Sequence, residues 1–272
     1  ADIKAEKLAQ SVFARAGKVL RQAGLPDFTE TSYEVIGSES HYGPARQVGN
    51  VREVDVKIAA RHPSPKGIGV LLKEMVGMAL TAPPGLTGFA GARPKPSPVV
   101  RLFSMIVPKD ELDISVELEG DAMRSNDPPG TVFDPGALVR PPVPEAAESG
   151  ESVSVPLEAL AWGRSGDKGN KANIGIIARQ KEFVPWIARQ ITAERVTELF
   201  GHFLAVDREE PVERFYLPGP HAFNFLLHDV LGGGGVASLR SDPQGKGYAQ
   251  LLLAEPVAVP RELAQRFNLE ML

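Results

Sequence analysis

Apolar positions in the first part of the chain follow helical spacing in two segments. Apolar side chains from Leu8 to Leu20 fall on one face, and Gly24 follows them, which predicts a helix over residues 2–23. Ser64 and Pro65 form an N-cap and a first-turn proline, which predicts a second helix over residues 65–80.

Strand patterns lie around these helices. Val54 and Val56 alternate with Asp55 and Lys57, which is typical of a sheet with one wet face. The same reasoning predicts strands over residues 33–36, 51–60, 99–107 and 114–118, and a Pro/Gly-rich loop over residues 82–98. Residues 119–150 have little periodicity and many prolines, which indicates an extended linker.

The second half of the chain also contains both helical spacing and strand alternation. Strands are predicted over residues 153–160, 174–178, 212–217 and 248–254, and helices over residues 192–203 and 222–231. Four glycines, Gly232 to Gly235, follow the last of these helices. We therefore predict an α+β fold of two α/β-sandwich domains, over residues 1–120 and 151–272, joined by a Pro-rich linker over residues 121–150.

Composition narrows the classes of function. The chain has 272 residues, a net charge of −4 and no cysteine. The mild acidity argues against a nucleic-acid or anionic-membrane partner, and the absence of cysteine excludes disulfides and thiolate chemistry. No apolar run approaches the roughly 20 residues that span a bilayer. We expect a cytoplasmic protein with neither a metal ion nor an organic cofactor.

Residues 163–173 hold the densest cluster of chemical groups. Three glycines, two asparagines, a hydroxyl, a carboxylate and three cations lie between two predicted strands, which predicts a loop longer than a hairpin needs. Backbone N–H groups of this loop would bind a phosphate or carboxylate. The residues assigned to that binding are Arg164, Ser165, Lys168 and Gly169.

A proton-transfer role is the second hypothesis for the same loop. Asp167 would act as the base, Asn170 and Asn173 would donate to a developing oxyanion, and His221, in the turn entering the predicted helix, would return the proton. The plain alternative is that Asp167 pairs in a turn, that the glycines reverse the chain, and that His221 caps the helix.

Other candidates lie outside this loop. Arg93 marks the Pro/Gly loop, and Lys246 belongs to a segment, residues 241–247, that would form a mobile cover with the four glycines. Glu39, His41 and Tyr42 form a polar cluster after a strand. Loops commonly carry such residues without chemistry, so this cluster gains weight only if folding brings it near Asp167.

Several motifs resemble one known family. RSGDKGN with NIGIIAR, the LPGPHAFNF run, the glycine cluster and SDPQGK resemble the ferredoxin-like C-terminal domain of the acyclic terpene utilisation protein A family. YEVIGSESHYG, REVDVKIAARHP and TGFAGARPKPSPVVRLFS resemble the part of that family just upstream. The resemblance implies a link to acyclic terpene breakdown through coenzyme A thioesters, and the chain is expected to be the C-terminal portion of a longer protein.

Two classes of function follow. The first is an enzyme, hydratase- or lyase-like, acting on a carboxylated or coenzyme A-linked acyl substrate by acid–base chemistry. The second is a non-catalytic assembly or ligand-binding module of a larger protein. In both cases we expect a homo-oligomer or association with an N-terminal region.

Overall fold

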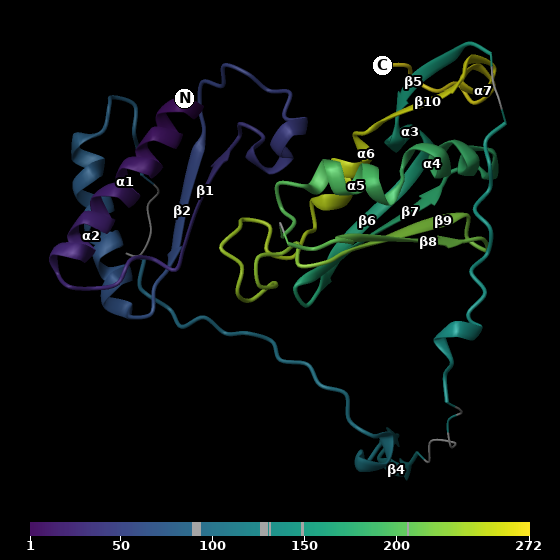
Figure 1. The fold of residues 1–272 in the computed structure, drawn as a ribbon, viewed down its shortest axis with the longest axis horizontal. Helices are drawn as coiled ribbons and strands as arrows, with labels where there is room; N and C mark the ends of the chain where they lie inside the picture. The colour runs from purple at the N-terminus through teal and green to yellow at the C-terminus, as the bar shows by residue number, and fades with distance from the viewer. Residues whose placement is uncertain (89–93, 126–129, 131, 148–149, 206) are drawn as a thin grey trace.

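The computed structural model describes residues 1–88, 94–125, 130, 132–147, 150–205 and 207–272. It has the mixed helix and strand content of an α+β fold, as predicted. An N-terminal and a C-terminal part lie side by side, and a long arm runs out from one and returns to the other (Figure 1).

The N-terminal part is a helix pair on a small sheet. Helix α1 (Asp2–Gln22), strand β1 (Glu30–Ile36), the short 3-10 segment η1 (Ser40–Ala45), strand β2 (Asp55–Arg61) and helix α2 (Pro65–Thr81) follow one another. Strands β1 and β2 pair antiparallel, and Ser64 Oγ accepts the backbone N–H of Lys66 at 3.3 Å, which confirms the predicted cap. Val12, Ala16 and Leu71 form the buried core.

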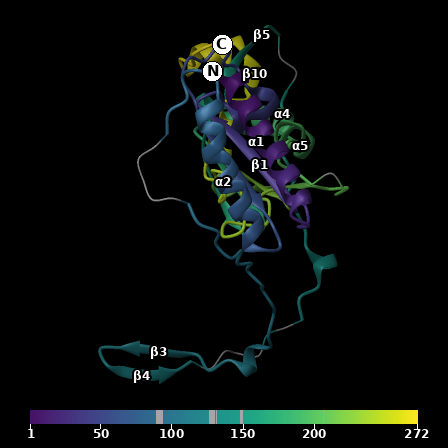
Figure 2. The same cartoon turned by 90° about the vertical axis from the view of Figure 1, so that its left-hand side faces the viewer.

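The arm connects the two parts. It carries η2 (Lys109–Glu111), the hairpin β3 (Ser115–Leu118) and β4 (Asp121–Arg124), and η3 (Pro135–Ala137), and the hairpin projects far from the body (Figure 2). The predicted strand over residues 99–107 is wrong, because no described strand lies beside this segment to pair with it. The division into two domains at residues 121–150 stays a prediction.

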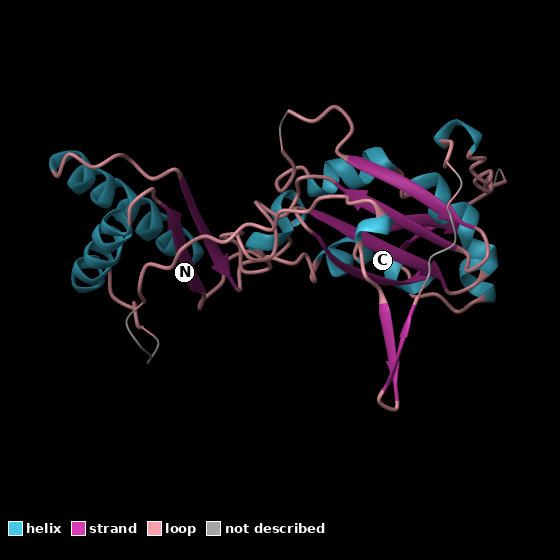
Figure 3. Cartoon of the chain, turned by 90° about the horizontal axis from the view of Figure 1, so that it is seen from below, coloured by secondary structure: helices cyan, strands magenta, loops and turns pink. Residues whose placement is uncertain are grey.

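The C-terminal part is built on a four-stranded antiparallel sheet in the order β6-β7-β9-β8. Its strands are β6 (Ala161–Lys168), β7 (Lys171–Ala178), β8 (Val212–Leu217) and β9 (Ala222–Leu227), and β5 (Ser152–Pro156) pairs separately with β10 (Pro256–Pro260). Helices lie over one face of this sheet (Figures 1 and 3). They are α3 (Leu157–Leu160), α4 (Val184–Gln190) with the preceding η4 (Lys181–Phe183), α5 (Ala193–Phe200) and α6 (Tyr248–Leu253). Helix α7 (Arg261–Arg266) packs against β5 and β10.

Four sequence predictions for this part are wrong. Residues 222–231 begin as strand β9, residues 248–253 form helix α6, and the predicted strand over residues 153–160 ends at Pro156, where helix α3 follows. Segment 163–173 is not a long loop, since β6 and β7 pair through it and leave only Gly169 and Asn170 as the turn. Gly169 has φ 69°, as the first central residue of a type II′ turn requires.

Candidate active site

The sheet of the N-terminal part turns its polar face toward the C-terminal part. Strand alternation places Glu30, Glu34, Lys57 and Arg61 on the face opposite to Ile58 and the helices. Arg61 pairs with Glu30 and donates to the backbone carbonyls of Gly232, at 3.2 Å, and Ala237. These contacts join residues some 170 positions apart.

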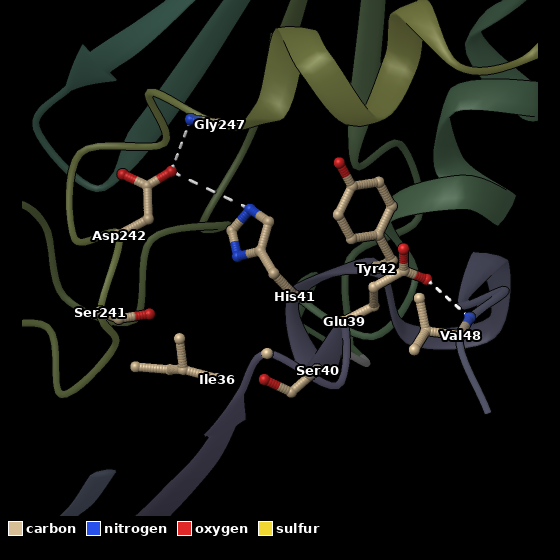
Figure 4. Close-up of a pocket in the computed structure, with 10 residues that line it drawn as sticks. Ile36, Glu39, Ser40, His41, Tyr42, Val48, Ser241, Asp242 and Gly247 are labelled. Carbon is tan, nitrogen blue, oxygen red and sulfur yellow. Dashed lines mark hydrogen bonds and ion pairs between the residues drawn. The ribbon is translucent and has the colours of Figure 1, made fainter. Parts of the chain in front are cut away.

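A pocket of about 540 Å³ opens between the two parts. Residues 36–48, which follow β1, form one wall, and residues 241–247, which precede α6, form the other. The volume lies within the range of small-molecule sites. The lining residues are Ile36, Gly37, Glu39, Ser40, His41, Tyr42, Val48, Ser241, Asp242 and Gly247 (Figure 4).

His41 is held between the two walls. Its ring packs against Phe203 and Tyr248, with ring centroids 5.0 and 5.6 Å apart, and its backbone carbonyl contacts His202 Nε2 at 3.0 Å. Burial lowers the pKa of His41 below 6.5, although Asp242 acts in the opposite direction. The neutral imidazole is therefore the form present at neutral pH.

Asp242 lies beside that imidazole. Its carboxylate accepts the backbone N–H groups of Lys246 at 2.9 Å and Gly247 at 2.7 Å, and Oδ2 lies 3.9 Å from His41 Nε2. This nitrogen is buried and has no hydrogen-bond partner among the described residues, and 3.9 Å is too long for a bond. The other nitrogen, Nδ1, is turned toward Ser241 and Ile36 (Figure 4).

Glu39 supplies a second ordered carboxylate. It adopts a left-handed backbone conformation, with φ 55°, and its Oε2 accepts the N–H groups of Gln47 at 2.7 Å and Val48 at 3.1 Å. These bonds hold the loop that forms the wall around His41. A left-handed conformation is uncommon outside glycine and costs energy that its surroundings must offset.

Tyr248 closes the aromatic layer behind the pocket. Burial raises the pKa of its phenol to about 12, and the hydroxyl donates to the carbonyl of Val230 at 3.2 Å. The phenol thus keeps its proton and donates it in a hydrogen bond to the backbone, so Tyr248 has a structural role beside His41.

The RSGDKGN segment supports this wall. Its residues form the hairpin of β6 and β7, so the expected long loop is not formed, and anion binding by the segment stays a prediction. Ser165 Oγ donates to the carbonyl of Lys246 at 3.1 Å and accepts the N–H of Ala249 at 2.9 Å. Asp167 Oδ1 lies 3.4 Å from the Nζ of Lys246, the residue whose backbone N–H binds Asp242.

Strand alternation puts Arg164 and Lys168, two cations assigned to anion binding, on the face of β6 opposite to Ser165 and Asp167. Lys168 Nζ donates to the backbone carbonyl of Asp167 at 2.8 Å. Gly169 lies in the tight turn. Arg93 lies outside the described residues.

The two asparagines bind within the fold. Asn170 accepts the N–H of Gly233 at 2.7 Å and donates to Asp229 at 3.2 Å. Asn173 donates to Asn224 at 3.2 Å across β7 and β9. Neither lies among the residues that line the pocket.

The predicted pair of Asp167 and His221 is not brought together. Asp167 is opposite Ala172 at one end of β7, while His221 accepts the N–H of Ala178 at the other end. Six residues of strand separate these positions, about 20 Å. His221 sits with φ 55° in the turn between β8 and β9, not at a helix start.

The glycine run is tied to its neighbours. Gly232 accepts a hydrogen bond from Arg61, and Gly233 donates one to Asn170. Gly234 approaches Gly169 so closely that a Cβ on Gly234 would lie 2.9 Å from the Gly169 carbonyl oxygen. Arg240 donates to the carbonyl of Val230 and, at 3.2 Å, to that of Phe203. The predicted mobile cover, the four glycines with residues 241–247, assumed that few side chains hold this segment, and that assumption is wrong.

Comparison with protein families agrees with the motifs. Residues 1–118 match the model of the acyclic terpene utilisation family protein AtuA, and residues 155–258 match the AtuA ferredoxin-like domain. The chain belongs to the AtuA family. The predicted resemblance is thereby confirmed for both parts. Neither a curated protein nor a solved structure matches the chain.

Among the residues that the structure describes, no helix of this AtuA-family chain has the length and apolar character of a membrane span. No group of three or more metal-ligating side chains occurs among them either. The site that sequence reasoning missed is the pairing of His41 with Asp242, although both residues lie in segments that carried the family resemblance.

Proposed function

We propose that this AtuA-family chain carries an acid–base site acting on a coenzyme A-linked acyl substrate, with His41 as the proton-transfer group. The observation that carries the proposal is the position of His41 Nε2, 3.9 Å from Asp242 Oδ2 in a pocket between two walls. A histidine whose pKa is lowered by burial, beside an ordered carboxylate, has the properties of a general base.

The charge of the pocket supports one of the two substrate classes over the other. Of the ten lining residues, Glu39 and Asp242 are carboxylates and none is Lys or Arg. A free carboxylate would be repelled there, whereas the neutral acyl group next to a thioester would not. The thioester class therefore fits this pocket better than the dicarboxylate class.

The reaction we propose is dehydration of a β-hydroxyacyl thioester, or its reverse. His41 Nδ1 takes the proton on the carbon next to the carbonyl, and Asp242 stabilises the imidazolium that forms. The imidazolium then gives this proton to the β-hydroxyl as its bond to carbon breaks, which yields an enoyl thioester and water. The proton count is balanced without a second base or a redox partner.

Calorimetric titration with acyl-coenzyme A thioesters and free dicarboxylates tests the substrate class. We expect a thioester to bind and Ile36→Trp, which fills the pocket from one wall, to weaken that binding at least tenfold. Ile177→Trp is the matched control, since Ile36 and Ile177 are 44% and 46% exposed. Equal binding by both variants, or binding of dicarboxylates alone, would contradict the proposal.

The open face of the four-stranded sheet favours a second candidate, a binding module. Trp162, Ile177 and Leu217 are 54%, 46% and 41% exposed there, on the face that the helices leave uncovered. If Ile177→Trp rather than Ile36→Trp abolished ligand binding, this face would be the binding site. The chain would then be a binding module and not an enzyme that uses the His41 pocket.

A further inference from the structure

The outgoing limb of the arm carries a largely exposed apolar segment. From Val99 to Val107, seven of the nine residues are apolar, with only Arg101 and Ser104 between them. Six of the seven are exposed, from 51% at Val99 to 101% at Ile106, and Val107 is half-buried. A solvated linker is normally poor in such side chains, so this composition indicates a segment that becomes covered.

The segment has the pattern of a strand that is covered on both faces. Side chains at odd positions, such as Phe103 and Met105, and at even positions, such as Leu102 and Ile106, are apolar alike. An apolar run of this kind is typical of a strand with protein packed against each face. The segment is about 30 Å long if extended.

A matching acceptor lies on the N-terminal part of the same chain. Its sheet has only β1 and β2, about 10 Å of width, under two helices that each occupy about 10 Å. Among the described residues no backbone hydrogen bond joins the outer edge of β2 to another strand. Helix α2 leaves Val76 and Leu80 64% and 88% exposed, so the helix layer extends beyond the sheet.

We propose that residues 99–107 of one copy add as a strand to the outer edge of β2 in a second copy. The arm leads this segment away from the β2 of its own chain (Figures 1 and 2), while each copy carries both the strand and the edge that accepts it. Reciprocal exchange closes a two-fold dimer and pairs the backbone groups at the outer edge of β2.

Sedimentation equilibrium on the chain over a hundredfold range of concentration tests the dimer. We expect twice the chain mass, and at least a tenfold weaker association for the double variant Phe103→Asp/Ile106→Asp. Val132→Asp is the matched control, because Val132 is 98% exposed on the returning limb and lies outside the segment. A monomer at every concentration, or a dimer unaffected by the double variant, overturns the proposal.

Cross-linking separates exchange from pairing within one chain. The protein has no cysteine, so Ser104→Cys and Ala59→Cys can be placed in two differently tagged copies and joined with a short bismaleimide. Exchange predicts a covalent species that contains both tags. If only a chain carrying both cysteines becomes cross-linked, and does so as a monomer, the strand docks on its own sheet and the proposal fails.

Discussion

Glu34 accepts two hydrogen bonds from Ser241, one from the backbone N–H at 2.6 Å and one from the hydroxyl at 2.7 Å. The two residues are 207 positions apart, and they join the polar face of β1 to the loop that carries Asp242. The pocket therefore depends on contacts between parts of the chain that are remote in sequence.

Removing the Glu34 carboxylate should weaken ligand binding in the pocket more than it lowers the stability of the fold. Glu34→Ala loses both bonds to Ser241, and we expect the free energy of unfolding to fall by about 1 kcal/mol, because the loop is exposed. Thioester affinity in a calorimetric titration should fall by a larger factor. Glu53→Ala, which removes an exposed carboxylate near the same strand, is the control and should change neither quantity.

The buried histidines should make stability depend on pH. Burial lowers the pKa values of His41 and His202 in the folded protein, while the unfolded chain binds these protons near pH 6.5. The unfolded state therefore holds more protons as the pH falls below about 6.5, and stability is lost toward the lowered pKa values. Urea unfolding at several pH values should show that His41→Gln loses less unfolding free energy on acidification than the unchanged chain. An unchanged dependence of unfolding free energy on pH would contradict the lowered pKa of His41.

A side chain at Gly234 should disrupt the contact between the glycine run and the β6–β7 turn. Gly234 has φ 92°, and its Cβ would lie 2.9 Å from the Gly169 carbonyl oxygen, so Gly234→Ala should cost about 1–3 kcal/mol. Gly219→Ala, where nothing lies within 4 Å, should cost much less. Denaturant midpoints of the two variants give the comparison, and equal midpoints would show that the contact is not required.

The local elements of the N-terminal part could be predicted because their signals are local. Helix α1, strand β1 and the Ser64 cap of α2 all follow from spacing and capping within a few residues. Residues 248–253 were harder, since Tyr248, Ala249, Leu251 and Leu252 are buried at helical spacing over only six positions. A short apolar run of this kind does not distinguish a helix from a strand.

The glycines of residues 163–173 illustrate why the candidate site could not be predicted. Only Gly169 has positive φ, while a Cβ on Gly163 would lie 3.1 Å from the side chain of Leu253 in α6. Gly163 thus allows a strand to pack closely against a helix. From the sequence alone, a glycine with this role cannot be distinguished from a glycine in a flexible loop. The meeting of His41 with Asp242 depends on how two remote loops pack, and no local spacing encodes it.

Asp167 should matter less than its motif implies. Its carboxylate pairs with the partly exposed Lys246, a contact worth about 0–1 kcal/mol, and it lies remote from His221. Asp167→Asn should keep proton-transfer activity within about tenfold of the unchanged chain. A loss of 100-fold or more, with the fold intact by circular dichroism, would restore Asp167 as the base.

Exchange of the proton next to the thioester carbonyl in D₂O, followed by NMR, tests the role of His41 most directly. We predict deuterium uptake into an acyl-coenzyme A that binds the chain, and a fall of about 10²–10⁴-fold in its rate for His41→Gln. His202→Gln, which changes another buried histidine beside the same loop, should keep the rate within about tenfold. Exchange at an unchanged rate in folded His41→Gln would contradict the account.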